Sequence, residues 1–216
     1  MHNTLDIPNF ITHSDIEEIK RRVYNATDEK TEFIDHWGVW KGKHVTTQHW
    51  VAKDQLSSVF SRVQEKLQTV LDLPFEIEKG QILQSYLAYD LHTDYFVKVD
   101  HVAEELQGIP YYTLIIPIAD FNSHTVVFEQ SADYNDFYLY KEKNPQIENH
   151  ISDEEWSKYC SHCWADDQEY VTLDRACSWE QGKLIGFDRR RFHSSDNFTE
   201  KLECKEAFVL WLREKK

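Results

Sequence analysis

A succession of short strand-forming segments after residue 80 most constrains the fold of this chain. The segments 81–89, 111–118, 125–128, 183–188 and 207–212 are rich in β-branched and aromatic residues, and polar or glycine-containing stretches separate them. Several short strands in series are typical of antiparallel sandwiches and barrels. The pattern therefore predicts a mainly β protein, a sandwich or barrel with helical support.

Two amphipathic helices are predicted ahead of these strands. Thr12 or Ser14 can cap the first, with Glu17 or Glu18 in its first turn. The second covers residues 53–71, where apolar residues recur at helical spacing. Residues 5–10 suggest a short strand or turn, and residues 33–50 suggest strands or loops. We expect both helices to buttress the sheet.

The length of 216 residues favours one domain, with helical support over about 1–80 and a β core over about 81–213. Residues 131–172 fit the β pattern poorly, because they are polar, aromatic and compatible with helix, especially around 153–159. We interpret them as an insertion between two barrel strands. Loops on a rigid scaffold often carry substrate contacts, and the insertion is a candidate for that role.

Composition narrows the class of protein. The formal net charge is -14, and a polyanionic surface repels phosphate backbones, so nucleic acid is disfavoured as a partner. No apolar run reaches membrane-spanning length and the first residues do not resemble a signal peptide, so we expect a soluble, cytoplasmic protein without membrane association. Four cysteines do not suggest a secreted disulfide scaffold. The oligomeric state stays open.

Three residues in the β region can form a metal site. His92 and Asp94 are separated by one residue, so both side chains point to the same side of an extended segment. His193 follows a late apolar strand, and early and late strands of a closed barrel can be neighbours. Two histidines and one carboxylate can bind one face of an octahedral Fe(II) and leave the other face open. The triplet alone is weak in a chain with eleven histidines, but its place beside predicted strands strengthens it.

The ordered set of motifs resembles the Fe(II)/2-oxoglutarate-dependent dioxygenases. Over residues 81–213, Tyr86 precedes the His92-x-Asp94 motif, and a segment with Gly182, Leu184, Phe187 and Asp188 leads to His193. Lys205 then precedes the final Val209-Leu210-Trp211 strand. The similarity is greatest to small prolyl-hydroxylase-like members, including relatives from marine phage and bacteria.

This resemblance implies a double-stranded β-helix core of the jelly-roll or cupin-like type, with flanking helices, and a role for each residue. His92, Asp94 and His193 would bind Fe(II), and Lys205 would hold the distal carboxylate of 2-oxoglutarate. Lys201 and Arg213 are alternatives to Lys205, whose other interpretation is a solvated edge lysine. Tyr86 would hydrogen-bond the co-substrate or serve as a core aromatic.

The resemblance also implies a reaction. With O2 as the oxidant, the enzyme would hydroxylate a C–H bond of a small molecule or of a protein or peptide side chain and release succinate and CO2. Asp94 disfavours halogenation, because related halogenases lack that carboxylate. A cupin-like metal enzyme without 2-oxoglutarate and a binding module without turnover are the alternatives.

Other signals are weaker. Cys160 and Cys163 form one CxxC pair, which is more typical of ordinary thiols than of a zinc site. His124 is interpreted as a hydrogen-bonded structural histidine, in preference to a residue that contacts substrate. The run 189–191 of arginines is interpreted as ion-pairing residues, although one of them could meet an anionic substrate. Trp37, Trp40 and Trp50 would form either a lid over the site or a wall of the core.

Overall fold

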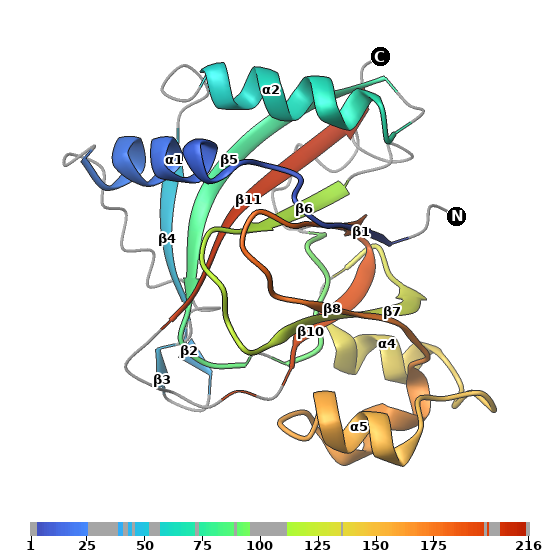
Figure 1. Ribbon diagram of the computed structural model, residues 1–216. Coiled ribbons are helices and arrows are strands. Elements are labelled where there is room, and N and C mark those ends of the chain that lie inside the picture. Colours follow the sequence, from blue (N-terminus) through green and yellow to red (C-terminus); the bar gives the residue numbers. More distant parts are fainter. Residues whose placement is uncertain are drawn as a thin grey trace.

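The computed structural model describes residues 4–25, 39–40, 43–44, 46–51, 57–71, 74–88, 90–95, 112–134, 136–196, 198 and 204–214. Two antiparallel sheets form the body (Figure 1). The larger sheet has the order β1-β9-β6-β11-β5-β4, with the bounds Leu5–Ile7, Leu184–Asp188, Tyr112–Pro117, Lys205–Glu214, Phe75–Ser85 and Thr46–Val51. The smaller has the order β10-β7-β8, with the bounds Arg191–Ser195, His124–Ser131 and Leu173–Ser178. This arrangement confirms the predicted double-stranded β-helix core.

The N-terminal region is more than helical support. Strand β1 pairs with β9, and β4 pairs with β5, so both add edge strands to the larger sheet. Strands β2 (Val39–Trp40) and β3 (Lys43–His44) form a separate hairpin. The core strand β5 begins at Phe75, six residues before the predicted start, and ends at Ser85. Pairing between distant segments decides these boundaries, and local residue preferences do not record it.

Helices α1 (His13–Asn25) and α2 (Ser57–Gln68) cover the outer face of the larger sheet (Figure 1). Their apolar residues Ile16, Ile19, Val59 and Val63 pack with Leu210 and other outward residues of the strands. The packing confirms that the two predicted helices buttress the sheet.

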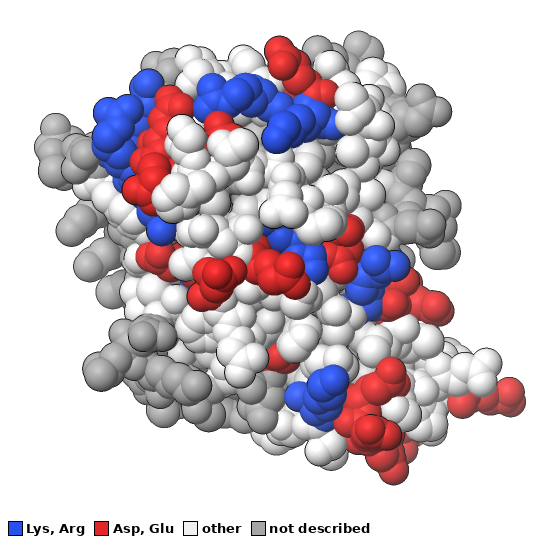
Figure 2. All heavy atoms as spheres, in the orientation of Figure 1, with Lys and Arg blue, Asp and Glu red and all other residues white. Residues whose placement is uncertain are grey.

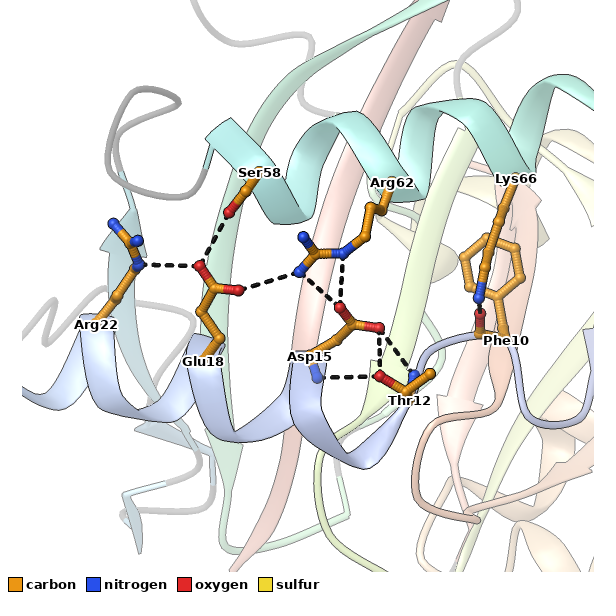
Figure 3. Close-up of polar contacts among 8 residues, drawn as sticks. All are labelled: Phe10, Thr12, Asp15, Glu18, Arg22, Ser58, Arg62 and Lys66. Carbon is orange, nitrogen blue, oxygen red and sulfur yellow. Dashed lines mark hydrogen bonds and ion pairs between the residues drawn. The ribbon is translucent and has the colours of Figure 1, made fainter.

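A polar network joins the two helices along their exposed side (Figure 3). Thr12 is the cap of α1, because its hydroxyl accepts from the Asp15 amide at 3.2 Å while Asp15 accepts from the Thr12 amide at 3.0 Å. Arg62 of α2 donates to Asp15 at 2.7 Å and to Glu18 at 3.0 Å. The network fixes the position of α1 relative to α2 on the sheet.

The interior between the sheets is a second apolar cluster. Alternation along β11 sends Phe208 and Leu210 toward the helices and Ala207, Val209 and Trp211 into the interior. Interior residues of the facing sheet include Val127 and Cys177. A side chain at an odd-numbered position of β11, up to the register shift after Trp211, therefore points between the sheets.

The insertion covers the outer face of the smaller sheet (Figure 1). It lies between β7 and β8 and contains α4 (Phe137–Lys143), α5 (Asp153–Tyr159) and the 3-10 helix η2 (Ala165–Tyr170). Its residues Phe137 and Trp156 form a third apolar cluster with Leu91 and Phe192 of the scaffold. The insertion is thus packed against the strands and is not a loose loop.

Helix length and surface charge complete the description of the fold. None of the described helices is both long and apolar enough to cross a membrane. On the face shown in Figure 2, lysine and arginine side chains over the helices lie next to aspartate and glutamate side chains. Charges of both signs are therefore interspersed on this face.

Candidate metal centre

His92 and His193 lie directly opposite each other across a backbone bridge. The amide of His92 donates to the carbonyl of His193 at 3.1 Å, and the reverse bond is 2.9 Å long. Their imidazole ring centres are 4.3 Å apart. His92 therefore extends the smaller sheet beside β10, and residues far apart in the sequence meet as the closed barrel predicted.

The backbone sets which nitrogen of each imidazole faces the centre. Nδ1 of His92 donates to the carbonyl of Asp90 at 2.7 Å, and Nδ1 of His193 donates to the carbonyl of Arg191 at 3.1 Å. A carbonyl only accepts, so each Nδ1 carries a proton, and Nε2 is the nitrogen of each ring that remains to bind a metal. This is the tautomer that a metal-binding imidazole needs.

Asp94 completes the group. Its Oδ2 lies 3.7 Å from Nε2 of His193 and accepts a hydrogen bond of 2.7 Å from the hydroxyl of Thr113 on β6. Its backbone is also fixed, because its amide donates to the carbonyl of Arg189 at 2.9 Å and its carbonyl accepts from the Arg189 guanidinium at 3.0 Å. Thr93 between the two motif residues is buried and donates to the carbonyl of Tyr134 at 2.9 Å.

Electrostatics keep His92 and Asp94 in the protonation states that suit a cation. Burial and, next, the neighbouring His193 lower the pKa of His92 to about 4, although Asp94 acts in the opposite direction. Burial would raise the pKa of the Asp94 carboxyl, but His193 and His92 outweigh that effect and hold this pKa below its usual range. A neutral His92 and an ionised Asp94 are the ligand forms of a divalent metal at neutral pH.

Candidate donor atoms of His92, Asp94 and His193 all lie within 4.8 Å of one another. Within the described ranges this is the sole group of three or more His, Cys, Asp or Glu side chains with that geometry. The structure brings the three predicted residues together, with two differences in detail. His92 does not follow directly on a strand, because β5 ends at Ser85. His193 lies within β10, a strand separate from β9 and part of the other sheet.

Lys205 is buried in the interior and is not a solvated edge residue. It begins β11, and its side chain is 1% exposed. Its Nζ reaches across the barrel to the smaller sheet, where it donates to the carbonyl of His124 at 2.8 Å and lies 3.4 Å from Oγ of Ser195. Burial lowers the pKa of its amine to about 7, although Asp196 acts in the opposite direction. Ser195 is the second residue after His193 on the same strand.

Tyr86 is not brought to this interior group. Its hydroxyl donates to Oε1 of Gln84 at 3.3 Å, and Gln84 pairs with Glu206 on β11. Glu206 and Lys205 are adjacent in the strand and point to opposite faces. The role in co-substrate binding predicted for Tyr86 gains no support from this arrangement.

The arginines of residues 189–191 are engaged within the protein. Arg190 pairs with Asp188 at 2.5 Å. The buried Arg191 donates to the carbonyl of Phe128 at 2.7 Å and to Asp174 at 2.9 Å. Arg189 holds the backbone of Asp94. The contacts of Arg190 and Arg191 support the predicted ion-pairing role, whereas Arg189 contacts the backbone carbonyl of Asp94.

The remaining candidates are also placed. His124 is hydrogen-bonded to Asp196 at 2.7 Å, as the structural interpretation predicts. Cys160 and Cys163 are free thiols. Trp37 and Lys201 lie outside the described residues, as do the side chains of Trp40, Trp50 and Arg213.

Two residues near the site were not recognised in the sequence. Thr113 is a polar residue at an inward position of an apolar strand, a pattern that could have flagged it. Trp179 lies under Lys205, with the ring centre 4.0 Å from Nζ. No local signal separates this tryptophan from an ordinary core residue.

Comparison with known proteins places the fold. No protein-family model and no curated protein sequence matches the chain. Among solved structures, it is similar to the non-haem alpha-ketoglutarate-dependent epimerase SnoN from nogalamycin biosynthesis, with a TM-score of 0.62 and 11% identity over 98% of this chain and 78% of SnoN.

Two further structures support the same assignment. HygX from Streptomyces hygroscopicus, with nickel, 2-oxoglutarate and hygromycin B bound, has a TM-score of 0.57 at 11% identity and covers 99% of this chain and 82% of its own. The viral collagen prolyl hydroxylase vCPH from Paramecium Bursaria Chlorella virus-1 has a TM-score of 0.53 at 13% identity, over 99% and 91%. The chain therefore has the double-stranded β-helix fold of the iron- and 2-oxoglutarate-dependent enzymes.

Proposed function

We propose that this protein is an Fe(II)- and 2-oxoglutarate-dependent oxygenase. The observation that carries the proposal is the convergence of His92, Asp94 and His193, together with the buried Lys205. This lysine contacts Ser195, which lies two residues after His193 on β10. Two imidazoles and one carboxylate match the donor set of non-haem Fe(II) oxygenases. The hydrogen bonds to Nδ1 of each histidine and to Oδ2 of Asp94 supply the outer support that such ligands need.

The spacing between the metal centre and Lys205 suits a short dicarboxylate. Inward-facing residues two apart on a strand are separated by about 7 Å. Lys205 contacts Ser195, which is two residues beyond His193, so its ammonium lies about one such step from the metal centre. A five-carbon 2-oxo acid can place its oxo and carboxylate oxygens at the metal and its distal carboxylate at Lys205.

The protein residues would bind, orient and shield. When bound, iron with 2-oxoglutarate and O2 supplies the oxidising chemistry that attacks a C–H bond and yields succinate and CO2. His92, Asp94 and His193 would hold the metal on one face, and Lys205 would fix the far end of the co-substrate. Phe187, whose ring centre is 4.5 Å from that of His193, keeps water away from one side of the imidazole.

Hydroxylation is the outcome we favour, because Asp94 supplies the carboxylate that halogenating relatives lack. SnoN is an epimerase, SnoK a carbocyclase and vCPH a prolyl hydroxylase, so this fold hosts more than one outcome. The substrate would be a small molecule or a protein or peptide side chain. The insertion packs behind His193, on the outer face of the smaller sheet, and would support the site from that side.

The test is an anaerobic titration of Fe(II) and 2-oxoglutarate, monitored by the visible metal-to-ligand charge-transfer band. We expect a band in the wild type, none in His193→Ala, and an unchanged band in His150→Ala, which removes an exposed histidine of the insertion. Iron binding without a band on addition of 2-oxoglutarate would contradict the proposal.

A metal enzyme that does not use 2-oxoglutarate is the second candidate. It is favoured by one observation: Lys205 already donates to the carbonyl of His124, as a purely structural lysine would. In that case Lys205→Ala would leave iron-dependent O2 consumption unchanged. Loss of 2-oxoglutarate affinity in Lys205→Ala, with iron affinity retained, would exclude this candidate.

A further inference from the structure

We propose that the indole N–H of Trp179 is a second donor to the distal carboxylate of the co-substrate. With Lys205 it would form a two-donor subsite that selects 2-oxo dicarboxylates over 2-oxo monocarboxylates. The inference rests on the proposed function and goes beyond it, because it assigns specificity to a residue outside the metal-binding motif.

Trp179 has an unused donor in a dry place. The side chain follows β8 directly, is 6% exposed and belongs to the apolar cluster between the sheets. Its Nε1 has no hydrogen-bond acceptor among the described residues. Buried polar groups are nearly always paired, so an indole N–H in this position indicates that an acceptor is supplied from outside the chain.

Lys205 lies over the same ring. Its Nζ is 4.0 Å from the ring centre of Trp179, so the two groups share one end of the interior. An ammonium has three N–H bonds, and those to His124 and Ser195 account for two of them. One bond is left for a ligand. A carboxylate, with two oxygens, can accept that bond and a second one from the indole.

The acid closest to this place is already engaged. Asp196 accepts hydrogen bonds from Ser123 through Oδ1 and from His124 through Oδ2, the latter at 2.7 Å. Its carboxylate therefore serves these two groups, and no ion pair joins it to Lys205 among the described contacts. The ammonium of Lys205 thus lacks a carboxylate partner among the described residues, and a ligand carboxylate would supply one.

The experiment compares two co-substrates that differ at the distal end. 2-Oxoglutarate and 2-oxopentanoate have the same length, but the second ends in a methyl group. Each is titrated anaerobically into the full chain loaded with Fe(II), and binding is measured calorimetrically and by the charge-transfer band. Trp179→Phe keeps an aromatic face under Lys205 and removes the N–H.

We expect Trp179→Phe to lower the affinity for 2-oxoglutarate by roughly tenfold to a hundredfold, which is the effect of losing one hydrogen bond to a charged group. The affinity for 2-oxopentanoate and for Fe(II) should not change. Trp211→Phe is the matched control, because it removes an indole of the same cluster at a position about 20 Å from Lys205 along β11. It should not alter either affinity. Equal weakening of both oxo acids by Trp179→Phe would reveal a structural role and overturn the proposal.

A second measurement uses the wild type and does not depend on the folding of a variant. In the Zn(II)-loaded protein, the assigned indole ¹⁵N–H resonance of Trp179 should move downfield when 2-oxoglutarate binds, and much less with 2-oxopentanoate. An equal response to both ligands would overturn the proposal. If wild type binds Fe(II) but neither oxo acid, the proposed function itself fails, and this result differs from the loss of selectivity alone.

Discussion

Replacing Lys205 by methionine should stabilise the protein at neutral pH while it removes the co-substrate anchor. The side chain is fully enclosed, and burial lowers the pKa of its amine from 10.5 to about 7. One pKa unit corresponds to about 1.4 kcal/mol. Enclosing the protonated amine therefore costs the folded state about 5 kcal/mol, an order-of-magnitude value.

Other contacts of the lysine reduce the gain from its removal. The carbonyl of His124 would lose its donor, which costs about 1 to 3 kcal/mol, and the contact with the ring of Trp179 contributes about 1 kcal/mol. Methionine fills a similar volume with no charge. The expected net stabilisation of Lys205→Met is about 2 kcal/mol below pH 7.

The pH dependence gives this prediction a sharper form. Below pH 7 the amine is protonated in both the folded and the unfolded protein, so wild type bears the full cost. Between pH 7 and 10.5 the folded protein releases a proton that the unfolded chain keeps, and the stability of wild type from this group rises with pH. The advantage of Lys205→Met should therefore shrink above pH 7 and reverse near about pH 8.5.

The assay is urea unfolding of both proteins, without metal or co-substrate, at a series of pH values from about 6 to about 9.5. A Lys205→Met protein that is less stable than wild type at pH 6, or a stability difference that does not change with pH, would refute the reasoning. Loss of 2-oxoglutarate binding in the more stable variant would be a trade of function against stability.

Three further predictions concern support of the site and the fold. Thr113→Val removes the hydrogen bond to Oδ2 of Asp94 and should weaken Fe(II) binding about tenfold in a chelator competition, whereas Thr113→Ser should retain it. Thr12→Ala removes the cap of α1 and should lower the free energy of unfolding by about 1 kcal/mol in urea, with no change in iron affinity. Gly186→Ala would place a Cβ 2.9 Å from Cδ2 of Leu114 and should cost about 1 to 3 kcal/mol; an unchanged melting temperature would show that β6 yields freely.

Local patterns in the sequence identified most elements of this fold. Periodic apolar residues gave α1 and α2, and the helix expected around residues 153–159 is α5. The strands β6, β7, β9 and β11 lie where β-branched residues cluster. The convergence of His92, Asp94 and His193 also followed from spacing and resemblance, because a closed barrel brings an early and a late segment together.

Features decided by non-local pairing were not visible in the sequence. Strand β10, which contains His193, has polar residues at four of its five positions, so it resembles an extension of β9. The burial of Lys205 exists only because two sheets face each other across it. The same is true of Trp179, whose apolar cluster includes residues of β7, β9 and β11.

The two histidines of the metal centre are each preceded by a residue that points the other way. Leu91 and Phe192 belong to the apolar cluster of the insertion, where Phe192 contacts Phe137 with ring centres 4.8 Å apart. The strand segments that carry His92 and His193 are thus held from behind by residues 131–172. Opening of the insertion and loss of the metal should therefore be one cooperative event, so that cleavage of this region by a protease releases the metal and bound metal protects the region from cleavage. Shortening the insertion should therefore weaken metal binding even if no residue of the insertion contacts the substrate.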